Sequence, residues 1–297
     1  MRTSRIVLAA VFAGSAIAGA QPASDPQALP KVIAIGREEI KPGRMSAHDK
    51  VNASFVAAIS KTKSETYWLG LMPVSGDDNS VLFLTGYDSF AAVEADRKQT
   101  DEIMATAAVK AEMDQLDRQS GDLHLTQKTT FARYRPDLSF RAPQTRDVAQ
   151  ARFMSVTTVR VKPGRIAEYA EYAKAYNAAR EKANVAQRFA VYQSVTGAPT
   201  GTFYVFSAEP SLEFLDKEWR TAIDGAVNPD DLKKLRHLAS EIIAYNESAV
   251  FAMSPKISRP SPQFVADDPG FWKPKIETKA LALKKEVKPA SAEPPKQ

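Results

Sequence analysis

The chain has 297 residues, a formal net charge of +5 at pH 7, 44% hydrophobic residues and no cysteine. Without cysteine it cannot form disulfides, thiolate metal sites or a cysteine nucleophile, so its stability must come from apolar burial. The positive excess lies at the two ends, in Arg2, Arg5 and the lysine-rich stretch from Lys273, and the body between them is close to neutral. We therefore expect no nucleic-acid partner, because binding phosphates requires a basic face.

Residues 1–20 have the features of an export signal. Two arginines precede an apolar run from Ile6 to Ala18, and Ala18-Gly19-Ala20 fits the small-residue cleavage pattern. So short a run, followed at once by polar residues, is not expected to remain as a membrane span. We expect a mature chain that begins at Gln21, is exported to the periplasm or secreted, and has no membrane-spanning segment.

The rest of the sequence contains one pattern twice. When Lys41-Pro42-Gly43-Arg44 is laid over Lys162-Pro163-Gly164-Arg165, a shift of 121 positions, apolar residues coincide from the preceding strand to two strands beyond. The coinciding pairs include Ile33 and Met154, Ile35 and Val156, Ile40 and Val161, Phe55 and Tyr176, Trp68 and Phe189, and Phe83 and Tyr204. A repeat of this length is a domain-sized unit, so the sequence predicts two tandem domains at 31–140 and 151–258, after linkers at 21–30 and 141–150.

The elements of the first repeat follow from its hydrophobic pattern and its turns. A strand over Val32–Ile40 ends at the Lys-Pro-Gly-Arg turn, and a helix follows on which His48, Val51 and Phe55 share a face. Two strands joined by a glycine-rich turn, a second helical region and a last strand complete the unit. We predict these at Thr66–Met72, Val81–Tyr87, Phe90–Arg118 and Thr129–Tyr134.

The second repeat is predicted to have the same order. Its strands are expected at Phe153–Val161, Arg188–Val195, Thr202–Ala208 and Ser248–Met253. Tyr169, Tyr172 and Tyr176 recur at helical spacing after the first strand, and a later helix restarts at Asn228-Pro229-Asp230, where a capping residue precedes proline. Residues 259–297 are rich in lysine and proline, and we expect them to form a disordered basic tail.

This order is the split βαβ pattern of a ferredoxin-like unit, which covers one face of its sheet with helices. Neighbouring strand residues are apolar on both faces, as in Trp68 with Leu69 and Phe203 with Tyr204, so the other face should be buried too. We predict an α+β fold of tandem ferredoxin-like (βαββαβ) repeats packed sheet to sheet. The chain should be a monomer, because its second copy takes the place of a dimer partner.

The three histidines give no metal motif in sequence. His48, His124 and His237 lie far apart, and none forms a helical ligand pair with a carboxylate, so no metal site is expected. His48 begins the apolar side of a helix, where a haem ligand, a general base and an ordinary half-buried histidine all remain open. His124 is expected at a surface or an edge, and His237 in solvent.

Aromatic side chains supply the candidate ligand-binding site. A tyrosine stripe with a few hydroxyl groups suits a cavity for a flat apolar ligand, although the same stripe is also typical of a core. The candidate ligand-binding residues are His48, Phe55, Trp68, Tyr169, Tyr172 and Tyr176.

The stretch from Val159 to Tyr169, with its Lys-Pro-Gly-Arg turn, resembles the first strand, turn and helix of the dimeric α+β barrel superfamily, notably its NIPSNAP-like and antibiotic-biosynthesis-monooxygenase-like branches. The resemblance covers both repeats and implies an intramolecular version of that barrel. Members include cofactor-independent oxygenases, haem-handling enzymes and proteins of unknown activity. Asn52, Trp68 and His48 match residue types that the oxygenases and haem-degrading relatives use, but their spacing matches no motif, so no catalytic role is transferred.

Two functions remain open from the sequence. The first is a non-catalytic exported module that binds a small apolar or aromatic ligand or an envelope component. The alternative is a cofactor-independent or haem-dependent oxidoreductase of the barrel type. Neither a cofactor nor a catalytic residue can be named from the sequence, and whether the protein is an enzyme stays open.

Overall fold

The computed structural model describes residues 27–273, which form one closed eight-stranded barrel with helices outside it. The expected export signal and most of the lysine-rich tail lie outside the described residues. The first half contains β1 (Val32–Ile40), α1 (Met45–Ser60), β2 (Leu69–Pro73), β3 (Ser80–Tyr87), α2 (Phe90–Met104), α3 (Ala107–Ser120) and β4 (His124–Tyr134).

The second half repeats this order and adds short helices at its ends. It contains α4 (Thr145–Ala149), β5 (Phe153–Val161), α5 (Ile166–Lys182), β6 (Ala190–Thr196), β7 (Thr202–Glu209), the 3-10 helix η1 (Leu212–Asp216), α6 (Trp219–Ala226), α7 (Pro229–Ile242), β8 (Ile243–Met253), α8 (Pro262–Asp267) and α9 (Pro269–Trp272). No helix within residues 27–273 is long and apolar enough to cross a membrane.

The two halves close the barrel together. The strand order is β1-β3-β2-β8-β5-β7-β6-β4, and all neighbours are antiparallel. The halves meet at two seams, β2 with β8 and β4 with β6. Two isolated β-bridges also connect the halves. Trp68 of the first half pairs with Arg259 of the second, and Phe140 of the first half pairs with Phe189 of the second. The barrel therefore has no free edge strand on which another chain could build.

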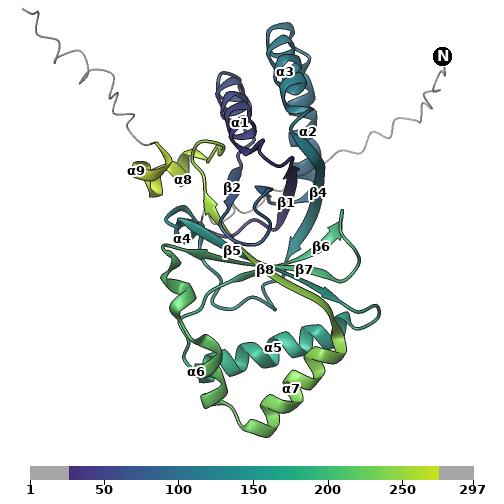
Figure 1. Cartoon of the computed structure of the whole chain (residues 1–297), viewed down its shortest axis with the longest axis vertical. Helices are drawn as coiled ribbons and strands as arrows, with labels where there is room; N and C mark the ends of the chain where they lie inside the picture. Colours follow the sequence, from purple (N-terminus) through teal and green to yellow (C-terminus); the bar gives the residue numbers. More distant parts are fainter. Residues whose placement is uncertain (1–26, 274–297) are drawn as a thin grey trace, which may run out of the picture.

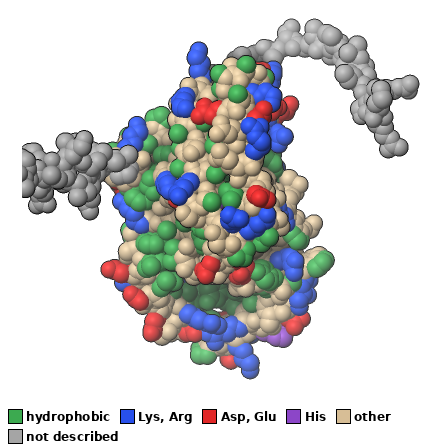
Figure 2. Space-filling model, turned by 45° about the horizontal axis from the view of Figure 1, so that its top comes forward, with side chains coloured by type: hydrophobic (Ala, Val, Ile, Leu, Met, Phe, Trp, Pro, Cys, Tyr) green, Lys and Arg blue, Asp and Glu red, His purple; other side chains and the backbone are tan. Residues whose placement is uncertain are grey.

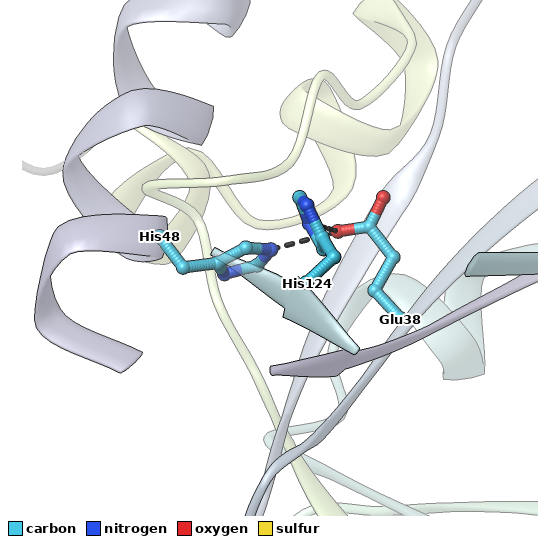
Figure 3. Close-up of side chains that lie close together, drawn as sticks. All are labelled: Glu38, His48 and His124. Atoms are coloured by element: carbon cyan, nitrogen blue, oxygen red, sulfur yellow. Dashed lines mark hydrogen bonds and ion pairs between the residues drawn. The ribbon is translucent and has the colours of Figure 1, made fainter. Parts of the chain in front are cut away.

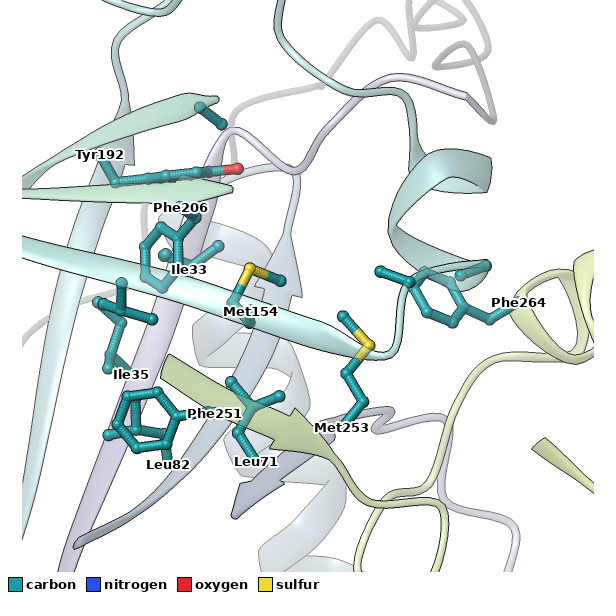
Figure 4. Close-up of a cluster of buried hydrophobic side chains, with 14 of the residues drawn as sticks. Ile33, Ile35, Leu71, Leu82, Met154, Tyr192, Phe206, Phe251, Met253 and Phe264 are labelled. Atoms are coloured by element: carbon teal, nitrogen blue, oxygen red, sulfur yellow. The ribbon is translucent and has the colours of Figure 1, made fainter. Parts of the chain in front are cut away.

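The barrel interior is one apolar core to which both halves contribute. Ile33 and Ile35 of β1 meet Met154 and Val156 of β5, and Phe251 of β8 lies beside them (Figure 4). The opposite faces of the strands carry separate apolar layers under the helices, such as the layer beneath α5. Both faces are thus buried, as the apolar pairs at neighbouring strand positions predict.

The Lys-Pro-Gly-Arg turn has the same geometry in both halves. Gly43 and Gly164 have φ of 77° and 78°, a left-handed conformation that glycine adopts without steric cost. In each case the helix begins directly after the turn, at Met45 and at Ile166. The turn therefore sets the angle at which α1 and α5 leave their strands.

Details of the predicted elements need correction. The helical region after β3 is two helices, α2 and α3, and β4 and β8 begin five residues earlier than predicted, at His124 and Ile243. The single shift of 121 does not hold throughout, because Gly36 pairs with Phe83 whereas Thr157 pairs with Val205. Leu69 pairs with Leu84, 15 positions later, whereas Ala190 pairs with Phe206, 16 positions later. The second hairpin therefore has one more residue between paired positions, and Val205, rather than Tyr204, is the structural counterpart of Phe83.

The expected tail and linker are also partly folded. Residues 262–272 form α8 and α9, and the side chains of Phe264 and Trp272 are only 9% and 5% exposed, because both join the barrel core. The linker expected at 141–150 contains α4, which contacts α8. Acidic and basic side chains are interspersed on the face shown in Figure 2, in keeping with the near-neutral body.

Candidate functional site

Three ionisable side chains come together between the sheet and the helices of the first half. Glu38 lies near the end of β1, His48 in the first turns of α1, and His124 at the start of β4 (Figure 3). Glu38 Oε2 lies 2.7 Å from His48 Nε2 and 3.1 Å from His124 Nε2. One potential ligand atom from each residue lies within 4.8 Å of the others.

Backbone geometry explains why these side chains meet. The Lys-Pro-Gly-Arg turn places His48 one helical turn after Arg44. The backbone N–H of His48 donates a hydrogen bond to the carbonyl oxygen of Arg44 at 3.0 Å. The first pairing of β4 with β1 sets His124 opposite Ile40, with a bulge between Glu39 and Ile40. Both histidines consequently lie above Glu38 on the helix-facing side of β1.

Neighbouring groups hold the three side chains in place. His124 Nδ1 lies 2.9 Å from the carbonyl oxygen of Ser120, and Gln127 Nε2 donates to Glu38 Oε1 at 3.1 Å. Asn52 Nδ2 lies 2.9 Å from His48 Nε2 and donates to the carbonyl oxygen of His48 at 3.2 Å. Because a carbonyl oxygen only accepts, His124 Nδ1 carries a proton, and neutral His124 presents a lone pair at Nε2.

Burial and charge act on Glu38 in opposite directions. Burial raises the pKa of the Glu38 carboxyl, whereas the hydrogen bond from His48 and the positive charge of His124 and His48 lower it. The lowering contributions prevail together, and the pKa of Glu38 lies below its ordinary value. The site therefore contains a carboxylate at neutral pH.

A second feature is a cavity of about 410 Å³ at one end of the barrel. Its floor is part of the barrel core, including Ile33, Met154 and Phe206. Residues 28–30, 143–148 and 260–264 line the cavity from outside the strands, as do Tyr67, Trp68 and Asp88 beside β2 and β3. The helices α4 and α8 overlap residues 143–148 and 260–264 (Figure 1).

The polar groups in the cavity wall are largely engaged within the protein. Tyr192 Oη donates to the carbonyl oxygen of Pro30 at 2.9 Å, and Tyr87 Oη donates to Asp96 at 2.8 Å. Trp68 Nε1 donates to the carbonyl oxygen of Ile257 at 2.9 Å. The wall consequently offers a ligand ring faces and aliphatic groups more than free hydrogen-bonding groups.

The residues named from sequence divide among three places. His48 belongs to the ionisable cluster, Trp68 lines the cavity, and Phe55 packs against Trp68 with ring centroids 6.0 Å apart. Asn52 contacts His48, but Trp68 does not join them. The proposed set of Asn, Trp and His is therefore not brought together as a unit.

The tyrosine stripe packs in the layer between α5 and the sheet. Tyr169 lies 4.6 Å from Phe203 between ring centroids and is 6% exposed, and burial raises its pKa to about 12. Tyr172 and Tyr176 flank it, and none of the three lines the cavity.

Glu38 and His124 were not singled out as a pair from sequence. His124 follows Glu38 by 86 positions, so no local spacing indicates that they meet. The expectation that no metal cluster forms rested on this separation, and the described residues contain a group able to hold a metal ion. The sequence feature that points to this site is the difference between the repeats: the first repeat has His48 where the second has Tyr169.

The strand order and the helices outside the barrel establish the fold. The chain is an α+β protein whose two similar halves together close one antiparallel eight-stranded barrel. Solved structures similar to it include an anthrone oxidase-like protein (12% identity, 78% of this chain and 92% of that chain covered, TM-score 0.48). Others are a proposed monooxygenase from Fusobacterium nucleatum (13%, 76% and 93%, 0.47) and a chlorite dismutase variant from Candidatus Nitrospira defluvii (10%, 77% and 92%, 0.44).

In sequence, no protein-family profile and no curated protein matches the chain. At these identities and scores the structural likeness carries no argument about chemistry.

Proposed function

We propose that this protein binds a small apolar or aromatic molecule in the cavity at the end of the barrel. The cavity itself carries the proposal, because about 410 Å³ is within the range of small-molecule sites and its walls are mainly apolar and aromatic. An envelope component would bind in the same cavity if the group that it inserts is an apolar chain or ring.

The proposal is of binding without catalysis. Glu38, His48 and His124 lie on the helix-facing side of the sheet, whereas Ile33 at the cavity floor faces the barrel interior. Glu38 follows Ile33 by five positions along β1, roughly 16 Å at the usual rise of a strand. The ionisable cluster is therefore too far away to act on a molecule in the cavity.

The proposal also includes an exported, monomeric chain whose two halves arose by duplication. We infer that residues 31–140 and 151–258 derive from a tandem duplication, since each half has the same order of strands and helices. We also propose that residues 1–20 are an export signal, which would bring the mature chain to the periplasm or outside the cell. The mass of the purified chain tests this, because a chain that retains residues 1–20 would contradict export.

Native mass spectrometry of the protein from its own host tests ligand binding. We expect a population heavier than the chain by the mass of one small molecule, which organic extraction removes. The stripped protein should then bind the apolar fluorophore N-phenyl-1-naphthylamine with one site per chain.

Variants that fill the cavity give the matched comparison. Leu84→Trp and Val148→Trp each place a bulky side chain at the cavity wall and should weaken fluorophore binding at least about tenfold. Leu215→Trp, at a residue 62% exposed on η1, should leave it unchanged. Equal binding by all three folded variants would contradict a site in this cavity.

The alternative, a barrel-type oxidoreductase, has its own test. The contact of His48 with Glu38 is the observation that favours it, because a carboxylate beside a histidine tunes the basicity of that histidine. A Soret band in the protein from its host, or oxygen consumption with a quinol, would establish it and reject the binding-only proposal. A colourless protein without turnover would reject the oxidoreductase.

A further inference from the structure

We propose that Glu38, His48 and His124 form a binding site for a divalent transition-metal cation. Two imidazole nitrogens and one carboxylate oxygen are a donor set typical of Zn²⁺ and Fe²⁺, and calcium and magnesium instead prefer oxygen donors alone. The site is separate from the cavity, so this proposal does not depend on ligand binding there.

The second half of the chain provides an internal reference for the three positions. Ile40 pairs with His124 as Val161 pairs with Ile243, so Ile243 is the counterpart of His124. Glu38 and His48 correspond to Val159 and Tyr169 under the repeat shift of 121.

The three counterparts pack in the apolar layer under α5. The fold is therefore satisfied by apolar side chains at these positions. Burying three ionisable groups there costs stability that their mutual contacts only partly offset, whereas apolar residues carry no such cost. Their presence in the first half is therefore not required by the fold, and a ligand would account for it.

Proton positions in the cluster also favour a cation. The Ser120 carbonyl fixes the proton of His124 on Nδ1 and directs its Nε2 lone pair toward Glu38 Oε2, 3.1 Å away. A lone pair facing a carboxylate oxygen is repulsive unless a positive charge lies between them, and either a second proton on His124 or a bound cation in the place of that proton supplies it. A histidine that donates one N–H to a backbone carbonyl and points its other nitrogen at the site is the usual arrangement of a metal ligand.

His48 adds an independent observation. Its side chain is fully buried, and its Nδ1 has no hydrogen-bond partner among residues 27–273. The fold thus uses Nε2 of this ring, which contacts Glu38, and leaves Nδ1 without a partner in the described residues. Asn52 Nδ2 lies 2.9 Å from His48 Nε2 and donates to the carbonyl oxygen of His48 at 3.2 Å, so Asn52 borders the site.

Supporting contacts and access complete the site. Gln127 holds Glu38 Oε1, which leaves Oε2 toward the histidines. The side chains of Glu38 and His124 are 20% and 10% exposed, so a cation can enter from solvent on that side.

Zn²⁺ titration of the EDTA-treated full-length protein tests the proposal. We expect one Zn²⁺ per chain by calorimetry and an increase in melting temperature with Zn²⁺. Replacing Zn²⁺ by Co²⁺ should produce visible d–d absorption bands. His124→Ala and Glu38→Gln should each weaken Zn²⁺ binding more than about 100-fold, and Gln127→Ala about tenfold.

Two further variants control for folding and for non-specific binding. The triple variant Glu38→Val, His48→Tyr, His124→Ile copies the second half and should fold but lose both the Zn²⁺ response and the Co²⁺ bands. His237→Ala removes the third histidine, which lies on α7 away from the cluster, and should bind like the wild type. Absence of stoichiometric Zn²⁺ binding by the wild type, or unchanged binding by His124→Ala and Glu38→Gln, would overturn the proposal.

Discussion

Gly164 and Gly197 have similar backbone angles in different surroundings. Their φ values are 78° and 84°. A Cβ at Gly164 would meet nothing within 4 Å, whereas a Cβ at Gly197 would lie 2.2 Å from the carbonyl oxygen of Thr129 and 2.8 Å from Cα of Thr130. Gly197 lies at the turn after β6, where β6 joins β4 of the other half. An alanine at Gly164 thus introduces backbone strain alone, whereas an alanine at Gly197 introduces the same strain and a steric clash with β4.

We expect Gly164→Ala to lower the free energy of unfolding by about 1–2 kcal/mol, the cost of a left-handed conformation for a residue with Cβ. Gly197→Ala should lower it by a further 1–3 kcal/mol or so, because the clash involves backbone that cannot rotate away. Urea denaturation measures both. Equal losses for the two variants would mean that the turn after β6 does not approach β4 this closely.

Sequence reasoning could identify part of the candidate site at this scale. His48 was recognisable because it replaces a tyrosine of the repeat on a helix that starts at a fixed turn. Glu38 and His124 were not, because their meeting depends on the bulge between Glu39 and Ile40 and on the start of β4 at His124. Strand register of this kind leaves little trace in hydrophobic alternation.

The C-terminal helices α8 and α9 attach to the barrel end through few but well-buried contacts. Trp272 Nε1 donates to the carbonyl oxygen of Ala149 at 2.8 Å, and its ring packs against Phe264 at 5.6 Å between centroids. Arg152 forms an ion pair with Asp268 at 2.5 Å. Since residues 260–264 line the cavity, this attachment also shapes the proposed ligand site.

Substitutions of Trp272 should show a graded loss of stability. Trp272→Ala should lower the free energy of unfolding by about 3–5 kcal/mol, because it removes a buried ring. Trp272→Phe keeps a ring but leaves the Ala149 carbonyl without its donor, and should cost about 1–3 kcal/mol. Denaturation curves and proteolysis of the C-terminal end measure both. A Trp272→Ala variant as stable as the wild type would show that α9 is not docked.

The helices and strands of the two repeats were largely predictable because their hydrophobic periods are regular. The folded part of the expected tail could have been recognised from Ser261-Pro262 and Asp268-Pro269, where a capping residue precedes proline in each case. The prediction of a disordered tail over residues 259–297 rested instead on composition, because lysine and proline are frequent in the residues after Trp272.

At the scale of the whole molecule, the proposed duplication accounts for the closed barrel. Each half supplies four strands, and β2 of the first half pairs with β8 of the second, as β6 of the second half pairs with β4 of the first. The sequence predicted that the two sheets bury each other. Closure into a barrel was implied only by the resemblance to the dimeric α+β barrel superfamily, because edge pairing leaves no mark in the alternation of apolar residues.

Closure within one chain is the claim on which the cavity, the seams and the monomeric state all depend. The chain has no cysteine, so a pair introduced across the β2–β8 seam is the only pair that can form a disulfide. Met72 and Ala252 are direct partners there, and facing strand residues lie within disulfide range.

The most direct measurement is therefore a non-reducing gel with light scattering on the oxidised double variant Met72→Cys, Ala252→Cys. The account predicts a cross-link within one chain, seen as a faster-migrating band that dithiothreitol reverses, at the mass of a monomer. A cross-linked dimer, or two thiols that stay free under oxidising conditions, would contradict it.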